Sequence, residues 1–144
     1  SALCLAEGLV KGGKLYTFDR NEEIVDRVTE YFEQSDYGYQ IEIRIGNALD
    51  QINAVDVVPD LVFIDADKES YLGYFEWCLT HMSPGSFILI DNVLWHGKVV
   101  DEKSLDKDKM TKIIHEFNQK IHLDSRVEQV LLPIRDGLTL VQIL

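Results

Sequence analysis

Hydrophobic and polar residues follow two different periods along the chain, and the period changes every few residues. Continuous apolar runs or strict alternation predict β-strands, whereas apolar residues three and four positions apart predict amphipathic helices. The expected strands are residues 14–19, 39–46, 61–65, 87–91, 126–134 and 137–144. The expected helices are residues 1–11, 21–35, 69–82 and 107–121, with a short helical or loop segment at 47–56 and a polar loop at 92–104.

The order of these elements indicates an α/β fold. Strands that alternate with helices join as parallel neighbours through crossover connections. The last two strands are separated only by the turn signal Arg135-Asp136-Gly137, which is too short for a crossover and predicts an antiparallel hairpin. We therefore expect residues 1–144 to form a single domain, with a mostly parallel sheet and an antiparallel C-terminal hairpin.

Composition and charge narrow the possible partners. The chain has 144 residues, of which 46% are hydrophobic and 27% charged, and its net charge is −11. Nucleic acids and anionic membranes would repel such a protein. Cys4 and Cys78 lack the CxxC spacing, which is typical of a reduced cytoplasmic protein, and no apolar stretch has the length of a membrane span.

Acidic residues end three of the expected strands. Asp19, Asp65 and Asp91 each follow apolar residues, and Asn92 comes directly after Asp91. Ligands of open parallel sheets bind beyond the carboxyl ends of the strands, and neighbouring strands lie about 5 Å apart. If their strands are neighbours, Asp65, Asp91 and Asn92 offer oxygen ligands that suit Mg²⁺, Ca²⁺ or Mn²⁺ better than zinc. The alternative is that Asp91-Asn92 is a simple strand-to-loop turn.

Four other polar or aromatic residues each allow two interpretations. Asp19 either accepts hydrogen bonds from a ribose diol or caps the next helix. Lys68 is either a solvated lysine at a helix start or a general base whose pKa is lowered by burial and a nearby cation. Trp95 either packs onto the core or forms the wall of an aromatic pocket. His96, the next residue, is either a ligand or a surface residue, and a surface position is the more common one.

Four stretches of sequence, taken together, have a familiar order. They are LYTFDRNEE, GNAL, the long segment from DLVFIDADKESY to LIDNVLWHGKVVD, and LPIRDGLTL. In this order they resemble the cation-dependent O-methyltransferases of the caffeoyl-CoA and catechol type. The resemblance implies a Rossmann-like class I methyltransferase sheet, S-adenosylmethionine as the methyl donor, Mg²⁺ or a similar cation, a hydroxylated aromatic substrate and a homodimer.

The same resemblance implies roles for individual residues. The implied cofactor-binding residues are Ser1, Asp19, Ala48, Asp65, Asp67 and Tyr71. The implied metal ligands are Asp65, Asp91 and Asn92, with Lys68 as the general base beside Asp65. Trp95 and His96 match the substrate-side loop. The family often has Asp where this chain has Asn47.

The start of the chain departs from this family. The family has an upstream strand and a glycine-rich loop before the helix with which this chain opens, and Ser1 matches the last residue of that loop. We therefore expect an N-terminal truncation and a gap between the strands that end in Asp19 and Asp65.

Two other functions stay open at this point. An NAD-dependent Rossmann oxidoreductase also uses an acid like Asp19, but gives no reason for Asp65, Asp91 and Asn92 together. A non-catalytic remnant of the methyltransferase fold would keep the sheet without its chemistry.

Overall fold

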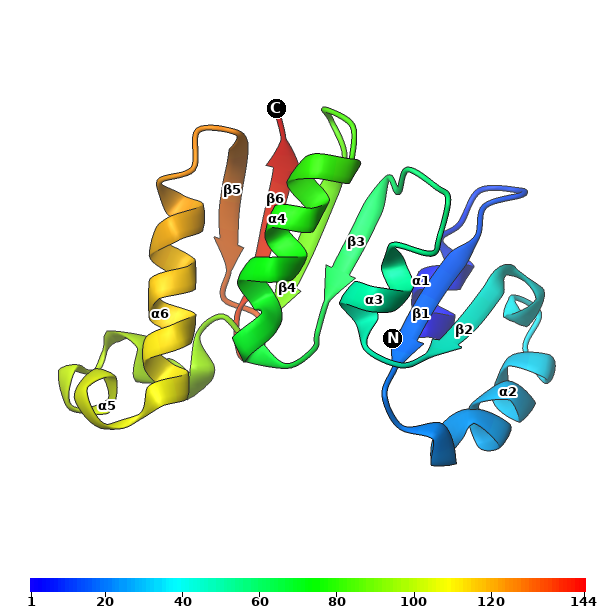
Figure 1. Ribbon diagram of the computed structural model, residues 1–144, viewed down its shortest axis with the longest axis horizontal. Helices are drawn as coiled ribbons and strands as arrows, with labels where there is room; N and C mark the ends of the chain where they lie inside the picture. Colours follow the sequence, from blue (N-terminus) through cyan, green and yellow to red (C-terminus); the bar gives the residue numbers. More distant parts are fainter. The chain divides into compact units, whose positions relative to one another are not determined.

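The computed structural model describes all of residues 1–144, which form two compact units, residues 1–56 and residues 57–144. Each unit has its own sheet, with strand order β1-β2 in the first and β3-β4-β6-β5 in the second (Figure 1). The strands that end in Asp19 and Asp65 therefore belong to separate sheets, as the sequence predicted.

The first unit is built on one parallel strand pair. Its strands are β1 (Leu15–Asp19) and β2 (Ile41–Ile45), and its helices are α1 (Ala2–Glu7), α2 (Val25–Glu33) and α3 (Ala48–Ile52), with single turns of 3₁₀-helix at Glu22–Ile24 and Gly38–Gln40. The connection through α2 makes β1 and β2 parallel, with Asp19 paired to Ile45. The predicted first helix is too long, because α1 ends at Gly8, where glycine weakens the helix.

The second unit contains the mixed sheet. Its strands are β3 (Leu61–Ile64), β4 (Phe87–Asp91), β5 (Val127–Leu132) and β6 (Leu138–Ile143), and its helices are α4 (Tyr71–His81), α5 (Glu102–Lys107) and α6 (Lys109–His122). β3 and β4 are parallel, whereas β6 runs antiparallel to both β4 and β5. This confirms the predicted C-terminal hairpin. None of the helices is long and apolar enough to cross a bilayer.

The core of the second unit lies between its sheet and the helices α4 and α6; Figure 1 shows α4 in front of β4 and β6, and α6 beside β5. Ile88 and Ile90 on β4 and Val141 on β6 are fully buried. Phe75 of α4 and Phe117 of α6 meet edge to face, with ring centroids 6.2 Å apart. Each side chain of this size contributes about 1.5–3 kcal/mol when it is buried. The core thus fixes the strands whose ends carry the candidate site.

The segment expected to be a polar loop contains helical structure, so that prediction is wrong. Two 3₁₀ turns lie within Trp95–Val100, separated by a kink at His96 and Gly97, and α5 begins after Asp101. Asp101 caps α5, because its side chain accepts a hydrogen bond from the Ser104 backbone N–H at 3.0 Å. Leu105 is the single apolar residue of α5, so the helix has no hydrophobic periodicity for a sequence reading to detect.

Candidate functional site

The carboxyl ends of β3 and β4 bring Asp65 and Asp91 to one edge of the second unit's sheet. β3 and β4 pair in parallel, with Ile64 opposite Ile90. Asp65 and Asp91 follow these paired residues directly. The condition on which the sequence analysis relied, that the two strands are neighbours, is met.

Lys68 lies at the centre of the polar groups on this edge. Its ammonium nitrogen is 2.8 Å from Asn92 Oδ1 and 3.8 Å from Asp65 Oδ1. It also donates a hydrogen bond to the Tyr71 hydroxyl. The Lys68 side chain is only 10% exposed. The alternative interpretation, a solvated lysine at a helix start, is therefore wrong.

Burial and charge act on Lys68 in opposite directions. Burial lowers the pKa of the ammonium group, because removal from water disfavours the charged form. Asp65, Asp91 and Asp136 each raise the pKa by Coulomb attraction, and the lowering by burial prevails. The amine is thus easier to deprotonate than an ordinary lysine, as a general base requires.

The buried side chain of Tyr71 contacts both Lys68 and the end of β4. The residue is 1% exposed, and its hydroxyl donates a hydrogen bond to the Asp91 backbone carbonyl at 2.9 Å. Its ring packs edge to face on Phe117, with centroids 5.5 Å apart. Burial, aided by the charges of nearby carboxylates, raises the pKa of the hydroxyl, so it stays protonated. The structure places Tyr71 in the core, where it fixes Lys68.

Asn92 turns its side chain toward Lys68 from an unusual backbone conformation. Its φ is 61°, in the left-handed region that asparagine tolerates better than most residues. Its backbone N–H donates to Asp91 Oδ1 at 2.7 Å. Asp91-Asn92 is therefore a strand-to-loop turn, and it also places an amide oxygen on the Lys68 ammonium.

The donor set at this edge fits a hard cation. Asp65, Asp91 and Asn92 supply oxygen atoms only, which is the ligand type of Mg²⁺, Ca²⁺ and Mn²⁺. No group of three or more His, Cys, Asp or Glu side chains is arranged to hold a metal ion, so a cation here would rely on two carboxylates and the Asn92 amide oxygen. The Asp65 side chain is 49% exposed, so a solvated ion can reach it.

Asp67 is engaged by the helix that follows it. Its carboxylate accepts hydrogen bonds from the Ser70 hydroxyl and, at 3.4 Å, from the Tyr74 hydroxyl. Asp67 also occupies the N-cap position of the 3₁₀ turn Lys68–Ser70. These contacts hold the turn that carries Lys68 into the site.

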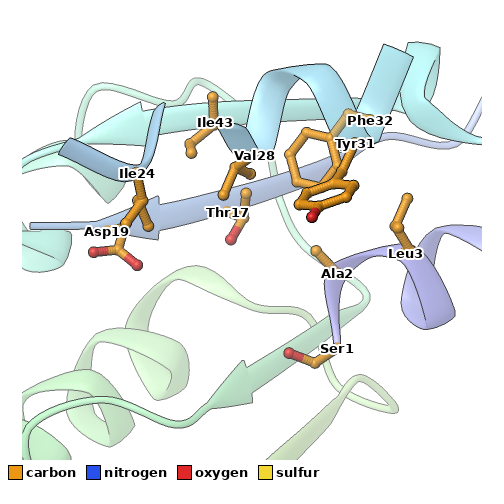
Figure 2. Close-up of a pocket in the computed structure, with 10 residues that line it drawn as sticks. All are labelled: Ser1, Ala2, Leu3, Thr17, Asp19, Ile24, Val28, Tyr31, Phe32 and Ile43. Carbon is orange, nitrogen blue, oxygen red and sulfur yellow. The ribbon is translucent and has the colours of Figure 1, made fainter. Parts of the chain in front are cut away.

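In the first unit, Ser1 and Asp19 line the same cavity. Its volume is about 310 Å³. Figure 2 shows Asp19 at the end of β1, with Ala2 of α1 and the Tyr31 ring of α2 around the same space. Asp19 Oδ1 accepts a hydrogen bond from the Asn21 N–H at 2.9 Å. The N-cap of the helical turn that follows is Asn21, whose side chain accepts from the Glu23 N–H, so Asp19 does not cap that turn.

Ala48 lies at the neighbouring strand end of this unit. The Gly46 N–H donates to the Asp19 carbonyl at 2.8 Å, which ties the turn before α3 to the end of β1. Asn47 caps α3 by accepting a hydrogen bond from the Leu49 N–H at 3.0 Å. Asn and Asp serve equally as N-caps, so the difference from the family pattern leaves this helix start intact.

Trp95 and His96 lie in the 3₁₀ segment after β4. Both have left-handed backbone conformations, with φ of 49° and 57°. The indole Nε1 of Trp95 is buried and has no hydrogen-bond partner. The His96 side chain is 75% exposed, as a surface histidine would be. The loop thus holds one buried aromatic edge and one open imidazole.

Asp136 belongs to this edge as well, and the sequence analysis treated it only as part of a turn signal. Its side chain is 18% exposed and accepts a hydrogen bond from the His96 N–H at 2.5 Å. The pairing of Leu138 with Asp91 is what brings the hairpin turn here. The predicted antiparallel hairpin could have indicated the position of Asp136. Because its second strand runs opposite to the parallel strands, the turn before that strand lies at the edge where the parallel strands end.

Known proteins resemble this chain along its whole length. Residues 1–144 match the family model described as O-methyltransferase. Caffeoyl-CoA O-methyltransferase 2 of Zea mays is 33% identical over 152 residues, covering 97% of this chain and 57% of the relative. Probable caffeoyl-CoA O-methyltransferase 2 of Dictyostelium discoideum is 32% identical over 146 residues, covering 98% of this chain and 63% of the relative. The chain thus spans about three fifths of the length of these curated relatives.

A solved structure agrees with these relatives. The O-methyltransferase from Bacillus cereus in complex with SAH is 32% identical to this chain, with a TM-score of 0.86. The match covers 99% of this chain and 68% of that protein.

Proposed function

Because the chain belongs to the O-methyltransferase family, we propose that the intact protein containing it methylates a hydroxyl group of a catechol-like or caffeoyl-type acceptor. The methyl donor is S-adenosylmethionine, and the reaction uses a divalent cation held at the ends of β3 and β4. The names of the relatives from maize and Dictyostelium support the acceptor class. The SAH in the Bacillus cereus structure supports the donor, since SAH is what S-adenosylmethionine becomes after it loses its methyl group.

One observation carries this proposal. The Lys68 ammonium, nearly excluded from water, is 2.8 Å from Asn92 Oδ1 and 3.8 Å from Asp65 Oδ1. A candidate base and two candidate cation ligands thus surround one point at the sheet edge. General acid–base catalysis and metal-assisted activation of a hydroxyl need these groups within reach of the same oxygen.

Asp65, Asp91 and Asn92 would hold the cation. When bound, it would polarise the acceptor hydroxyl and offset the carboxylate charges that raise the pKa of Lys68. Vicinal hydroxyls suit such a site, because two adjacent oxygens can occupy the positions that the three protein ligands leave open.

Lys68, in the neutral amine form that its lowered pKa makes easier to reach, would take the acceptor's proton on Nζ. S-adenosylmethionine, when bound, would supply the methyl group to the acceptor oxygen, and its sulfur would keep the electron pair of the broken carbon–sulfur bond. Tyr71 and Asn92 hold Nζ in place for the proton transfer. Most of the rate gain would come from holding the two reactants in line.

The first unit would bind the adenosine part of the donor. Asp19 would accept hydrogen bonds from the ribose hydroxyls, and the Ala48 backbone would contact the adenine. Ser1 lines the same cavity as Asp19. In the second unit, Asp65 and Asp67 are the residues proposed for the methionine end. Trp95 and His96 would face the acceptor.

A panel of acceptors tests this function directly. The intact protein is incubated with methyl-labelled S-adenosylmethionine and catechol, caffeoyl-thioester and flavonoid diols, with Mg²⁺ or with EDTA. We expect label in at least one vicinal diol with Mg²⁺ and a loss of transfer in EDTA. Transfer that is equal in EDTA would refute the cation, and no transfer to any diol would refute the acceptor class.

A further inference from the structure

The β5–β6 hairpin turn, residues 133–137, lies at the edge of the sheet that carries the proposed site. β6 runs antiparallel to β4, and its first residue, Leu138, pairs with Asp91, the last residue of β4. An antiparallel strand begins where its parallel neighbours end. The turn therefore delivers Asp136 next to the loop that follows β4.

This turn binds the backbone of that loop at successive positions. The Val93 N–H donates to the Gly137 carbonyl at 3.3 Å, and the Leu94 N–H donates to the Asp136 carbonyl at 2.9 Å. The His96 N–H donates to Asp136 Oδ1 at 2.5 Å. Only the last of these bonds is made by a side chain, so a substitution can remove it alone.

The segments that meet here contain all the strained non-glycine residues of the chain. Positive φ values occur at Asn92, Trp95, His96 and Arg135. Such conformations are unfavourable for residues other than glycine and persist only where surrounding contacts hold them. Trp95 and His96 are consecutive, so this part of the loop carries the most strain and needs an anchor.

The hairpin turn and the loop after β4 pack closely against each other. Gly137 has φ 81°, and a Cβ at that position would lie 2.5 Å from Leu94 Cγ. The turn and the loop therefore approach each other closely enough for Asp136 to reach the His96 N–H. The Asp136 carboxylate also lies 3.9 Å from His96 Nδ1, at the edge of ion-pair distance.

We propose that Asp136 is a positioning residue. Its carboxylate accepts a hydrogen bond from the His96 backbone N–H and thereby holds Trp95 and His96 in the conformation that binds the methyl acceptor. This inference rests on the proposed methyl transfer and adds a determinant of acceptor affinity to it. Asp136 acts through the loop, as a hydrogen-bond acceptor. The role therefore predicts an effect on the KM of the acceptor and little effect on kcat.

Three variants of the intact protein separate the hydrogen bond from the charge. Asp136→Ala removes both, and we expect the KM of the acceptor to rise about tenfold with kcat within about twofold. Asp136→Asn keeps an acceptor oxygen and removes the charge, so it should restore the wild-type KM within about twofold. Asp106→Ala, an exposed acid of α5, is the matched control and should leave both constants unchanged.

Tryptophan fluorescence reports the position of the loop that carries Trp95 and His96, independently of enzymatic activity. With Trp95 as the only tryptophan, Trp77 being replaced by Phe, the half-buried indole, whose Nε1 is covered, should emit at shorter wavelength and be quenched less by acrylamide than an exposed indole. Asp136→Ala should shift the emission to longer wavelength and increase quenching, and Asp136→Asn should not. If Asp136→Ala does not fold, Asp136→Glu displaces the carboxylate by one methylene and should raise quenching in the same direction.

The outcomes distinguish the two proposals. Unchanged Trp95 quenching in Asp136→Ala, in an active protein, would overturn the anchor and leave methyl transfer standing. A kcat that changes equally in Asp136→Ala and Asp136→Asn, with KM unchanged, would overturn it in favour of a charge effect on Lys68, whose pKa the Asp136 carboxylate raises. If the wild type methylates no diol, the proposed function fails, and the fluorescence still decides whether Asp136 holds the loop.

Discussion

The ammonium nitrogen of Lys68 lies 2.8 Å from the amide oxygen of Asn92, although 24 residues separate the two in sequence. Lys68 enters from the turn after β3, and Asn92 from the turn after β4. Because these strands pair in parallel, both turns leave the sheet at the same edge. The contact joins a candidate base to a candidate cation ligand.

Replacing Lys68 tests its role as a base. Lys68→Met keeps a long apolar stem and removes the amine, so we expect kcat to fall by about 10²–10⁴-fold. Magnesium affinity should fall much less, because Lys68 is not a ligand. Steady-state kinetics and magnesium titration measure the two effects, with Lys109→Met, a surface lysine with an 81% exposed side chain, as the control. Equal losses of turnover and affinity would remove the assignment.

Asn92 combines a backbone role with a ligand role, and two substitutions separate them. Asn92→Gly accepts φ 61° without strain, whereas Asn92→Ala is expected to lose about 1 kcal/mol of unfolding free energy relative to it. Both variants lack the amide oxygen and should bind magnesium weakly. Urea unfolding measures the first effect and calorimetry the second. An Asn92→Gly variant that binds magnesium like the wild type would exclude Asn92 as a ligand.

Tyr71 should matter for stability. Tyr71→Phe removes the hydrogen bonds to Lys68 and to the Asp91 carbonyl, and we expect the free energy of unfolding to fall by about 1–3 kcal/mol. Urea unfolding gives the value. Tyr39→Phe, at an 81% exposed position, should change it by less than about 0.5 kcal/mol. A loss no greater than that of the control would mean that the buried hydroxyl contributes nothing net.

The ion pairs of Glu76, which lie outside the candidate site, should make the free energy of unfolding depend on pH. Hydrogen bonds from Arg126 and then Lys120 lower the pKa of Glu76 below its usual 4.5. The unfolded chain therefore binds the proton more tightly, so the stabilisation is complete above pH 4.5 and is lost as the pH falls through the folded-state pKa. The Glu76 side chain is 38% exposed, which limits the effect to about 1 kcal/mol or less.

The Glu76→Gln variant measures this contribution. Its unfolding free energy should be lower than that of the wild type at pH 7, and the difference should shrink as the pH falls below 4.5. Glu116→Gln, in an exposed pair with Lys112, is the control and should differ little at either pH. A difference between Glu76→Gln and wild type that persists unchanged at pH 3 would contradict the ion-pair explanation.

The sequence predicted that Asp65 and Asp91 lie at one edge of the sheet, because the signal for this is local. Apolar runs that end in Asp65 and Asp91 are visible in the chain, and the rule that parallel strands end at one edge supplies their proximity. The burial of Lys68 could not be read in the same way. It depends on Tyr71 and on the packing of α4 against the sheet, which no short stretch of sequence encodes.

The hydrophobic pattern of the sequence did not predict two features of the structure, and the reasons differ. The helix Glu102–Lys107 is polar on nearly every side, so the N-cap residue Asp101 is the only sequence signal that predicts it. Asp136 looked like an ordinary hairpin residue, since turns favour aspartate on local grounds alone. Its importance comes from the pairing of Leu138 with Asp91, which is a property of the assembled sheet.

Magnesium binding to the Asp65→Ala variant of the intact protein tests the central claim most directly. Asp60→Ala removes an acid just before the other end of the same strand and serves as the matched control. We predict that Asp65→Ala loses magnesium binding, measured by isothermal titration, and metal-dependent turnover. Its affinity for S-adenosylmethionine should fall much less, because Asp67 and the first unit would still bind the donor, while Asp60→Ala keeps all three properties. Magnesium affinity and turnover unchanged in Asp65→Ala would contradict a cation site at the ends of β3 and β4.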